Sequence, residues 1–434
     1  MNGRFFKFLY KIHIYVGIFV AVHLFVLILT GTILILKDEI EGNAGDGEEH
    51  HAEVVPAMDA HLEKILLKYP GDRPQSFNVE EADHDVAQLR MGNNGSKLFR
   101  ESHRVYFNVH TGEEVAAPKK SDGVMDFILR LHREFLLGSN GKLYVGLIGV
   151  LYAFTLISGF FIYGNFARKT NFGEVRRGST RATMGDLHRF IGMTAFAWSL
   201  MIGVTGSFLG FSSTLIKVFQ YSELQKLNVQ YPTAPQAPLA SLDKVIASAQ
   251  KALPESTFDF MVFPDTQFSP PGHFMVLMHG NTPMTERLVE LVIIDGVTGE
   301  LTEVRELPWY LKVAMLSEPL HFGNYGGLFL KILWVILSVA SLVMPVSGIY
   351  IWWNRRRKKA PAASAKATSV QPWKGALFKR IYTVPVILSV FSTAAVIGSF
   401  LVQGALNTIF VAALVVPVSI VVYFLISWLK KGAQ

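Results

Sequence analysis

The chain has 434 residues, of which 50% are hydrophobic and only 17% are charged, with a mean hydropathy of +0.31. This composition excludes an ordinary soluble protein and predicts an integral membrane protein with extramembrane domains. Cysteine is absent, which excludes disulfides, cysteine-bound iron–sulfur clusters and c-type haem. The net charge of +7 does not indicate nucleic-acid binding, because the basic residues lie in short loops beside apolar runs.

The first half of the chain begins with an apolar stretch and continues into a polar region. Residues 14–36 are apolar for long enough to cross a bilayer, and we interpret them as a retained anchor rather than a signal peptide. In the polar region, helical spacing predicts a helix over Met58–Tyr69, and alternating residues predict a hairpin that turns at Thr111-Gly112. Residues 122–137 form an amphipathic stretch that contains His132 and is expected to lie at the membrane surface.

The second half repeats this plan. Its polar region predicts a helix over Leu242–Leu253 and a hairpin that turns at Gly296–Gly299. The Ala/Ser-rich residues 360–370 predict a flexible linker. Counted along the chain, the expected segments are an N-terminal segment with span 1 (1–36), a first periplasmic domain with the interfacial helix (37–142), span 2 (143–164), a cytoplasmic loop (165–186), span 3 (187–211), a second periplasmic domain (212–320), span 4 (321–353), a basic cytoplasmic linker (354–380), span 5 (381–402) and span 6 (406–429).

The predicted fold class is therefore an α-helical integral membrane protein with six spans, an internal duplication and two small α+β domains. Lys and Arg are concentrated before the first span, between the second and third spans, and in residues 354–380. By the positive-inside rule these segments and both termini are cytoplasmic, and both α+β domains lie on the outer side.

The duplication is indicated by histidines at matched distances from glycines. His13 precedes Gly31 of Thr30-Gly31 by 18 residues, and His188 precedes Gly206 of Thr205-Gly206 by the same number. A second pair of distances also matches, since His132 precedes Gly159 of Ser158-Gly159, and His321 precedes Gly348 of Ser347-Gly348, by 27 residues. Two parallel repeats imply a pseudo-two-fold axis along the membrane normal. Such an axis would bring His13 opposite His188 near the inner face and His132 opposite His321 near the outer face.

Paired histidines in a membrane bundle are functional candidates, because an ionisable side chain is costly there. Two neutral imidazoles that face each other can hold the iron of a b-type haem from both sides without any cysteine. Gly17 and Gly192, one turn from two of the histidines, would leave room for a porphyrin. A lone histidine before a span is usually a solvated boundary residue. The interpretation as haem ligands therefore depends on the four histidines lying at matched positions of the two repeats. They predict two haem b groups, with His13, His132, His188 and His321 as iron ligands.

The remaining histidines carry weaker signals. His23 lies inside span 1, on a different face from His13, and remains open as a substitute ligand, a proton relay or a packing residue. The pair His50-His51 could bind a metal, although a solvated loop is the simpler interpretation. No H-E-x-x-H motif, dinucleotide fingerprint or P-loop occurs in the sequence. The sequence therefore supports no integral protease, nicotinamide site or ATPase.

The histidine-headed spans that end in Thr-Gly, the Leu131-His132-Arg133 and Leu320-His321 elements and the Ser-Gly spans together resemble the PepSY-associated transmembrane family. The hairpins Val109-His110-Thr111-Gly112-Glu113 and Val297-Thr298-Gly299-Glu300 support the same resemblance, which covers roughly residues 5–355. In particular, the chain is similar to inner-membrane siderophore reductases of bacteria. The resemblance implies haem b, two periplasmic PepSY domains and reduction of ferric iron in a siderophore. Tyr15 and Phe322 depart from the commoner motif neighbours, Arg or Trp, at haem-edge positions.

The resulting hypothesis is a ferric-siderophore reductase of the bacterial inner membrane. A separate donor, either a quinol or a cytoplasmic reductase, would supply electrons, and a periplasmic ferric siderophore or other ferric chelate would accept them. One alternative is a haem-free regulator or chaperone whose PepSY domains bind a periplasmic peptide or protease. Another is a siderophore transporter, which the repeat symmetry favours but for which the sequence lacks broken spans with paired charges.

Overall fold

A computed structural model describes residues 3–42, 58–80, 83–117, 123–167, 171–234, 238–282, 285–357, 375–402 and 405–430. The chain divides into two compact units. The helical unit comprises Met1–Gly45, Asp122–Phe211 and Ser317–Gln434, and the sheet unit comprises Asp46–Ser121 and Ser212–Leu316. The predicted linker at 360–370 and the pair His50-His51 lie outside the described residues.

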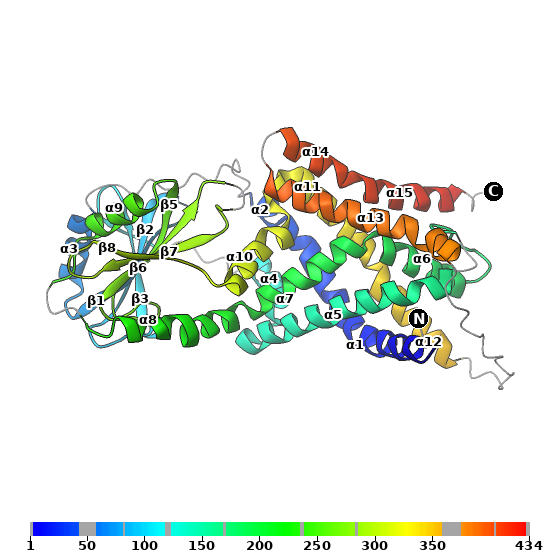
Figure 1. Cartoon of the computed structure of the whole chain (residues 1–434), viewed down its shortest axis with the longest axis horizontal. Coiled ribbons are helices and arrows are strands. Elements are labelled where there is room, and N and C mark those ends of the chain that lie inside the picture. The colour runs from blue at the N-terminus through cyan, green and yellow to red at the C-terminus, as the bar shows by residue number, and fades with distance from the viewer. Residues whose placement is uncertain are drawn as a thin grey trace. The chain divides into compact units, whose positions relative to one another are not determined.

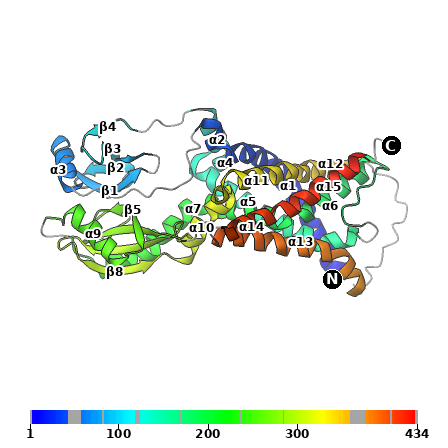
Figure 2. The ribbon, with the colours of Figure 1, turned by 90° about the horizontal axis from the view of Figure 1, so that it is seen from above.

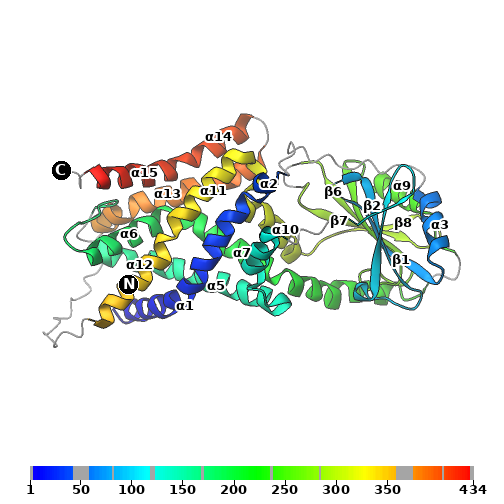
Figure 3. The ribbon, with the colours of Figure 1, turned by 180° about the vertical axis from the view of Figure 1, so that it is seen from behind.

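The helical unit is a bundle of helices that pack side by side. Its elements are α1 (Gly3–Ile35), α2 (Lys37–Glu41), α4 (Val124–Glu134), α5 (Gly138–Phe166), α6 (Thr180–Thr194), α7 (Phe196–Phe219), α10 (Trp309–Phe322), η4 (Asn324–Gly326), α11 (Gly327–Ser341), α12 (Val343–Arg357), α13 (Gly375–Leu401), α14 (Ala405–Ala413) and α15 (Val415–Lys430). α1 packs against α5, α11 and α12 (Figure 3). α13 packs against α14, which packs in turn against α15; α14 and α15 lie end to end along one side of the bundle, and α13 runs beside them (Figure 1).

Five helices of the described chain are long and apolar enough to cross a membrane, so the protein is a multi-pass membrane protein. They are Arg4–Ile35, Gly138–Phe166, Phe196–Gln230, Asn324–Arg357 and Ile381–Leu401. The stretch predicted as span 6, residues 406–429, comprises α14 and α15 with a bend at Leu414, and its apolar helix Leu406–Ile420 is shorter than the other five. Pro417 accounts for the bend, because its ring has no N–H for the carbonyl of Ala413 and clashes with that carbonyl.

Two other predicted spans are also bent or interrupted, which the hydropathy pattern did not predict. Span 4 (321–353) lies largely within the helix Asn324–Arg357, which is kinked at Leu342 between α11 and α12, where Pro345 acts on the carbonyl of Ser341 as Pro417 does on Ala413. Span 3 (187–211) is divided at Ala195, where the Thr194 hydroxyl donates to the Phe190 carbonyl at 2.9 Å. Such bonds to the preceding turn bend helices. His188 consequently lies on α6, ahead of the membrane-spanning helix.

The sheet unit contains the helices and hairpins expected from the periodicity. Its elements are α3 (Met58–Lys68), β1 (Asp72–Glu80), β2 (Asp83–Asn93), η1 (Phe99–Glu101), β3 (Ser102–Asn108), β4 (Glu114–Val115), the π-helical turn η3 (Gln220–Leu224), α8 (Gln225–Gln230), α9 (Leu242–Ala252), β5 (Ser256–Val262), β6 (His273–Gly280), β7 (Val289–Asp295) and β8 (Leu301–Glu306). Gly112 and Gly299, with φ of +65° each, form the two predicted turns, which require a left-handed residue.

The expectation of two separate α+β domains is wrong, because the strands of both polar regions join in one antiparallel sheet. The strand order is β4-β3-β2-β1-β5-β6-β7-β8, and Figure 2 shows the β1–β4 half with α3 and the β5–β8 half with α9. The halves are joined where β1 pairs with β5, with Phe77 opposite Met261. Each half alone would leave an unpaired edge at this strand, and the pairing satisfies both edges.

One hydrophobic core serves both halves of the sheet. Phe77, Leu89 and Phe107 are buried in the same cluster as residues of β5–β7, and the cluster includes side chains of both α3 and α9. The two helices also cap each other. Asp59 accepts the backbone N–H of Leu242 at 2.6 Å, and Asp243 accepts the N–H of Met58 at 3.0 Å. The halves are thus tied through the sheet, the core and two reciprocal helix caps.

Candidate functional site

The structure brings together two of the sequence-predicted histidines near one end of α1. His13 on α1 and His188 on α6 have ring centroids 6.4 Å apart. We call them the inner pair. α6 holds His188 at this position because it packs against α12, which in turn packs against α1.

The other two histidines meet near the opposite end of α1. His132 on α4 and His321 on α10 have ring centroids 6.3 Å apart, and we call them the outer pair. His132 contacts α1 beside Thr30, which is 17 residues, or about 25 Å of helix rise, from His13. The two pairs therefore lie at well-separated levels of one bundle.

All four imidazoles bind a hydroxyl group through Nδ1. His132 contacts Thr30 at 3.0 Å and His321 contacts Thr205 at 3.0 Å, while His13 contacts Ser158 at 3.2 Å and His188 contacts Ser347 at 2.9 Å. Thr30 and Ser158 donate their protons to carbonyls of their own helices, at 2.7 Å to Val26 and 2.9 Å to Thr155, and Thr205 and Ser347 donate in the same way. The hydroxyl oxygens must then accept at the histidines, so every Nδ1 carries the proton and donates.

This assignment leaves Nε2 of each histidine as the basic nitrogen. Within the described chain no hydrogen bond to Nε2 is found for any of the four. A neutral imidazole that donates from Nδ1 to a fixed acceptor is the form in which histidine binds a metal through Nε2. The four side chains thus share one tautomer and one orientation.

Each histidine also packs against the glycine that follows its hydroxyl partner. An added Cβ would lie 2.9 Å from Cε1 of His132 at Gly31, 3.0 Å from that of His13 at Gly159, 3.0 Å from that of His321 at Gly206, and 3.6 Å from that of His188 at Gly348. At the first three positions such an atom would displace the ring. The Thr-Gly and Ser-Gly motifs, used above only as landmarks of the repeat, therefore form the surfaces that receive the histidines.

The separation within each pair fits a metal bound between the two rings. Two imidazoles bound to opposite sides of one metal through bonds of about 2 Å have ring centroids about 6 Å apart. The observed 6.4 and 6.3 Å agree with this value. Among the described residues no group of three or more His, Cys, Asp or Glu could hold a metal ion. Each pair therefore offers two imidazole nitrogens to a metal held between the rings.

A cavity of about 480 Å³ surrounds the inner pair, which is within the range of cofactor sites. It is lined mainly by apolar side chains from α1, α5, α6 and α12, and both predicted glycines, Gly17 and Gly192, line it. A Cβ at Gly17 would lie at 3.5 Å from the Thr155 methyl carbon, whereas at Gly192 it would meet the Met344 methyl carbon at 2.9 Å. There is therefore more free space beside Gly17 than beside Gly192.

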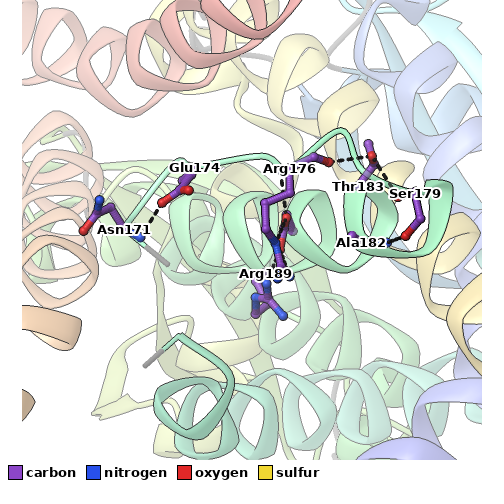
Figure 4. A network of polar contacts seen from close by, with 8 residues as sticks. Asn171, Glu174, Arg176, Ser179, Ala182, Thr183 and Arg189 are labelled. Carbon is purple, nitrogen blue, oxygen red and sulfur yellow. Dashed lines mark hydrogen bonds and ion pairs between the residues drawn. The ribbon is translucent and has the colours of Figure 1, made fainter. Parts of the chain in front are cut away.

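The polar lining of this cavity includes four arginines, from the 171–189 region and from α12: Arg176, Arg181, Arg189 and Arg355. The buried carboxylate of Asp186 binds Arg176 at 2.9 Å and also pairs with Arg189, as Figure 4 shows for these arginines. Ser179 caps the next helix by accepting the N–H of Ala182 at 3.3 Å. Arg355 lies 5.4 Å from the ring centroid of Tyr10. This side of the cavity carries a net positive charge suited to carboxylates.

His23 lies outside both pairs. Its Nδ1 donates to the Phe19 carbonyl at 2.8 Å, and its Nε2 accepts from the Tyr144 hydroxyl at 2.7 Å. With both nitrogens occupied, the structure favours the packing interpretation over the ligand interpretation. Two residues were noted above as differing from the commoner residues of the motif, Tyr15 and Phe322. Tyr15 is 67% exposed, and the ring of Phe322 lies 6.0 Å from that of His321.

The backbone around the outer pair is bent sharply on both sides. α4 ends two residues after His132, and Phe135 and Leu136 then adopt φ of 47° and 61°, which is unusual for residues with large side chains. His321 belongs to α10 rather than to the predicted span 4, and Gly323 with φ of 70° begins the turn toward α11. These two turns present the histidines at the ends of short helices. The amphipathic stretch predicted at residues 122–137 contains α4, whereas α10 was not predicted from the sequence.

The family model of the PepSY-associated TM region matches residues 10–355. An uncharacterized protein of Pseudomonas aeruginosa is 25% identical to the chain over 263 residues, which cover 56% of this chain and 66% of the relative. The match thus spans just under two thirds of that relative's length. Because the family match includes all four histidines, their hydroxyl partners and the whole of the sheet unit, the chain belongs to the PepSY-associated TM family.

Proposed function

We propose that this membrane protein is a haem b oxidoreductase that carries electrons across the bacterial inner membrane to a ferric siderophore in the periplasm. The observation that carries the proposal is the pair of bis-histidine arrangements, in which four Nδ1 atoms donate to Ser or Thr hydroxyls and four Nε2 atoms remain available. Haem b held at each pair would supply a one-electron Fe(III)/Fe(II) couple toward each face of the membrane.

The likeness of the two halves supports a duplicated electron path. In the first half, His13 binds Ser158 and His132 binds Thr30; in the second, His188 binds Ser347 and His321 binds Thr205. Each site takes one histidine from each half. Residues at equivalent positions thus make equivalent bonds, as the proposed pseudo-two-fold axis requires.

The residues around the inner pair have distinct roles in this proposal. The two imidazoles hold the iron, the apolar walls exclude water, and Gly17 leaves space for the macrocycle. Arg181 and Arg355 balance the carboxylates of the macrocycle. Asp186 fixes Arg176 and Arg189 through ion pairs with its buried carboxylate. All these groups belong to the helical unit.

The orientation in the membrane follows from cationic and aromatic residues at the end of α12. Arg356 lies 4.4 Å from the ring centroid of Trp352, and Arg357 lies 5.4 Å from that of Trp353. Aromatic rings and arginines at the end of a spanning helix are typical of the membrane interface, and basic residues favour the cytoplasmic side. The inner pair and both termini are therefore cytoplasmic in our proposal, and the sheet unit is periplasmic.

Iron release needs one electron for each ferric ion. The sequence has no flavin or nicotinamide motif, so a separate quinol or cytoplasmic reductase supplies the electrons, two per quinol. Reduction weakens a chelate of hard oxygen ligands, because the ferrous ion is softer and less charged.

Purified protein, expressed with haem supplied, tests the proposal through its absorption spectrum and haem content. We expect a Soret band, a reduced-minus-oxidised b-type spectrum and two haems per chain, with oxidation of the reduced protein by a ferric siderophore. A protein without a Soret band would refute the reductase and favour a PepSY regulator or chaperone. One haem per chain would refute the two-site path.

A further inference from the structure

The two halves of the sheet unit differ on one side of the sheet. On the side opposite the shared core, β5–β7 present the apolar residues Val262, Met275, Leu291 and Ile293. These pack against Phe219, Leu224 and Leu227, from the end of α7, from η3 and from α8. This part of the sheet is therefore covered by a helical segment of the same unit.

The same side of β1–β3 is polar. Ser76 of β1 is paired with Val262 of β5, so both side chains point to the side of the sheet that α8 covers in the other half. Side chains alternate along a strand, so Asn78 on β1 and the residues paired with Ser76 and Asn78 on β2 and β3 also point to this side. The register places Asn78 opposite Gln88 and Gln88 opposite Tyr106, and it places Arg90 opposite Arg104. We call these five residues, Asn78, Gln88, Arg90, Arg104 and Tyr106, the polar face. All five are partly or wholly exposed.

Hydrogen bonds hold the polar face in a defined arrangement. Tyr106 donates to Gln88 at 3.2 Å, and Gln88 donates to Asn78 at 2.8 Å. Arg90 donates from one Nη to the Phe99 carbonyl and to the Ser102 hydroxyl, at 3.0 Å each, and its guanidinium lies 4.9 Å from the Phe99 ring centroid. The other N–H groups of Arg90 have no hydrogen bond within the described chain.

The two arginines form a like-charge pair at directly opposed positions, an arrangement that destabilises a sheet. Burial and the charge of Arg104 lower the pKa of Arg90. No carboxylate of the described residues lies within 4.0 Å of either guanidinium. Among the described residues the two arginines thus lie side by side without a carboxylate partner, and an anion bound there would relieve the repulsion and contact both guanidinium groups.

We propose that the polar face binds a net-anionic ferric chelate through Arg90 and Arg104, so that anionic siderophores are the preferred substrates. This inference rests on the proposed function for its choice of ligand. Three adjacent strands span about 10 Å, which is comparable with a small chelate of one iron. Charge complementarity argues for an anion, and a rigid row of donors argues for a ligand rich in oxygen atoms.

The test measures binding without redox chemistry, on the full-length protein in detergent. The probe is a trianionic Ga(III) tris-catecholate, which cannot be reduced, and the comparison is a neutral Ga(III) tris-hydroxamate. Equilibrium dialysis gives both affinities for the wild type, for Arg104→Gln and for Arg90→Gln/Arg104→Gln. Arg104 is exposed, so its substitution spares the fold; Lys251→Gln on α9, on the core side of the sheet, is the matched control for charge.

We expect Arg104→Gln to weaken binding of the anionic probe about tenfold and the double substitution to weaken it further. Added salt should weaken wild-type binding, and Lys251→Gln should not. Absence of wild-type binding, an unchanged affinity in the double variant, or equal loss for both probes would each overturn the proposal. Inhibition of the anionic probe by an acidic peptide at equal concentration would point to a protein partner instead and also overturn it. Haem content, measured separately, decides the proposed function independently.

Discussion

Nδ1 of His132 lies 3.0 Å from Oγ1 of Thr30, whose own proton is donated to the helix backbone. This bond fixes the histidine tautomer and directs Nε2 away from α1. Replacing Thr30 with Val keeps the shape of the side chain and removes the acceptor. We expect Thr30→Val to lower the affinity of the outer site for haem about tenfold and to shift its reduction potential, as changes around metal-bound histidines do. Haem titration and redox potentiometry of the purified variant measure both effects.

Thr32→Val is the matched control, because Thr32 is on the same helix but binds Ser338 at 2.7 Å rather than a histidine. An outer site that responds equally to both substitutions would show that the Thr30 bond has no particular role.

Gly159 and Gly348 offer a comparison within one site. A Cβ at Gly159 would lie 3.0 Å from the His13 ring, whereas at Gly348 it would lie 3.6 Å from the His188 ring, an ordinary contact. We therefore expect Gly159→Ala to displace His13 and to reduce inner-site haem severalfold, and Gly348→Ala to have little effect. Haem per chain and the spectral component of the inner site test this. Equal loss in the two variants would contradict the role of the close contact.

Substitution of the paired histidines should show that each pair acts as a unit. His13→Ala and His188→Ala should each remove the inner haem, and the double variant should lose little more, because two ligands of one iron are not independent. His13→Ala with His132→Ala should remove both haems. His23→Phe should retain both, since His23 already binds Phe19 and Tyr144. Loss of a haem in His23→Phe while His13→Ala keeps both would refute the pairing.

The reciprocal caps predict a pH effect on the sheet unit. Burial, and then the charge of Asp59, raise the pKa of Asp243 above its ordinary value of 3.8. The folded state therefore binds more protons than the unfolded state above about pH 4, and stability from this group falls as the pH rises through the raised pKa. Asp243→Asn keeps an acceptor for the Met58 N–H and removes the repulsion, so it should reduce this fall by less than about 1 kcal/mol.

Thermal unfolding from about pH 4 to about pH 7 measures the difference between Asp243→Asn and the wild type. A larger fall in stability with rising pH in the variant would contradict the assignment. Asp295→Asn provides a contrast, since backbone hydrogen bonds from Thr298 and Val297 lower the pKa of that carboxylate against the effect of burial. Asp295→Asn should therefore lower the stability at pH values above the ordinary pKa of aspartate. This effect is opposite in sign to the one expected for Asp243→Asn.

The topology predicts which segments a protease reaches from the periplasm. Protease added to intact spheroplasts should cut within residues 37–142 or 212–320 and spare residues 360–370, because the positive-inside rule places the latter in the cytoplasm. Lysed spheroplasts, in which both sides are accessible, are the control. Cleavage at 360–370 in intact spheroplasts would reverse the orientation.

The periodic elements were accessible from local sequence. The helix α3 and the turns at Gly112 and Gly299 follow from side-chain spacing and from backbone preferences that act over a few residues. The bends at Leu342 and Leu414 could also have been predicted from the sequence, since each lies three residues before a proline, although the predicted spans ran straight through them. The pairing of β1 with β5 could not be predicted from the sequence, because the second and third predicted spans separate these two strands along the chain.

The sequence by itself determined the membrane class, the histidine-headed repeats and the four histidines as one set, because hydrophobicity and spacing are properties of the chain alone. Only the tertiary structure decided that the two sheet halves are continuous and that His23 binds Tyr144. It also showed which hydroxyl accepts the hydrogen bond from each Nδ1 and which glycine each imidazole packs against. The bond between Thr30 and His132 joins residues 102 positions apart, and the one between Ser158 and His13 joins residues 145 apart. Contacts over such separations depend on how the helices pack, which no local pattern encodes.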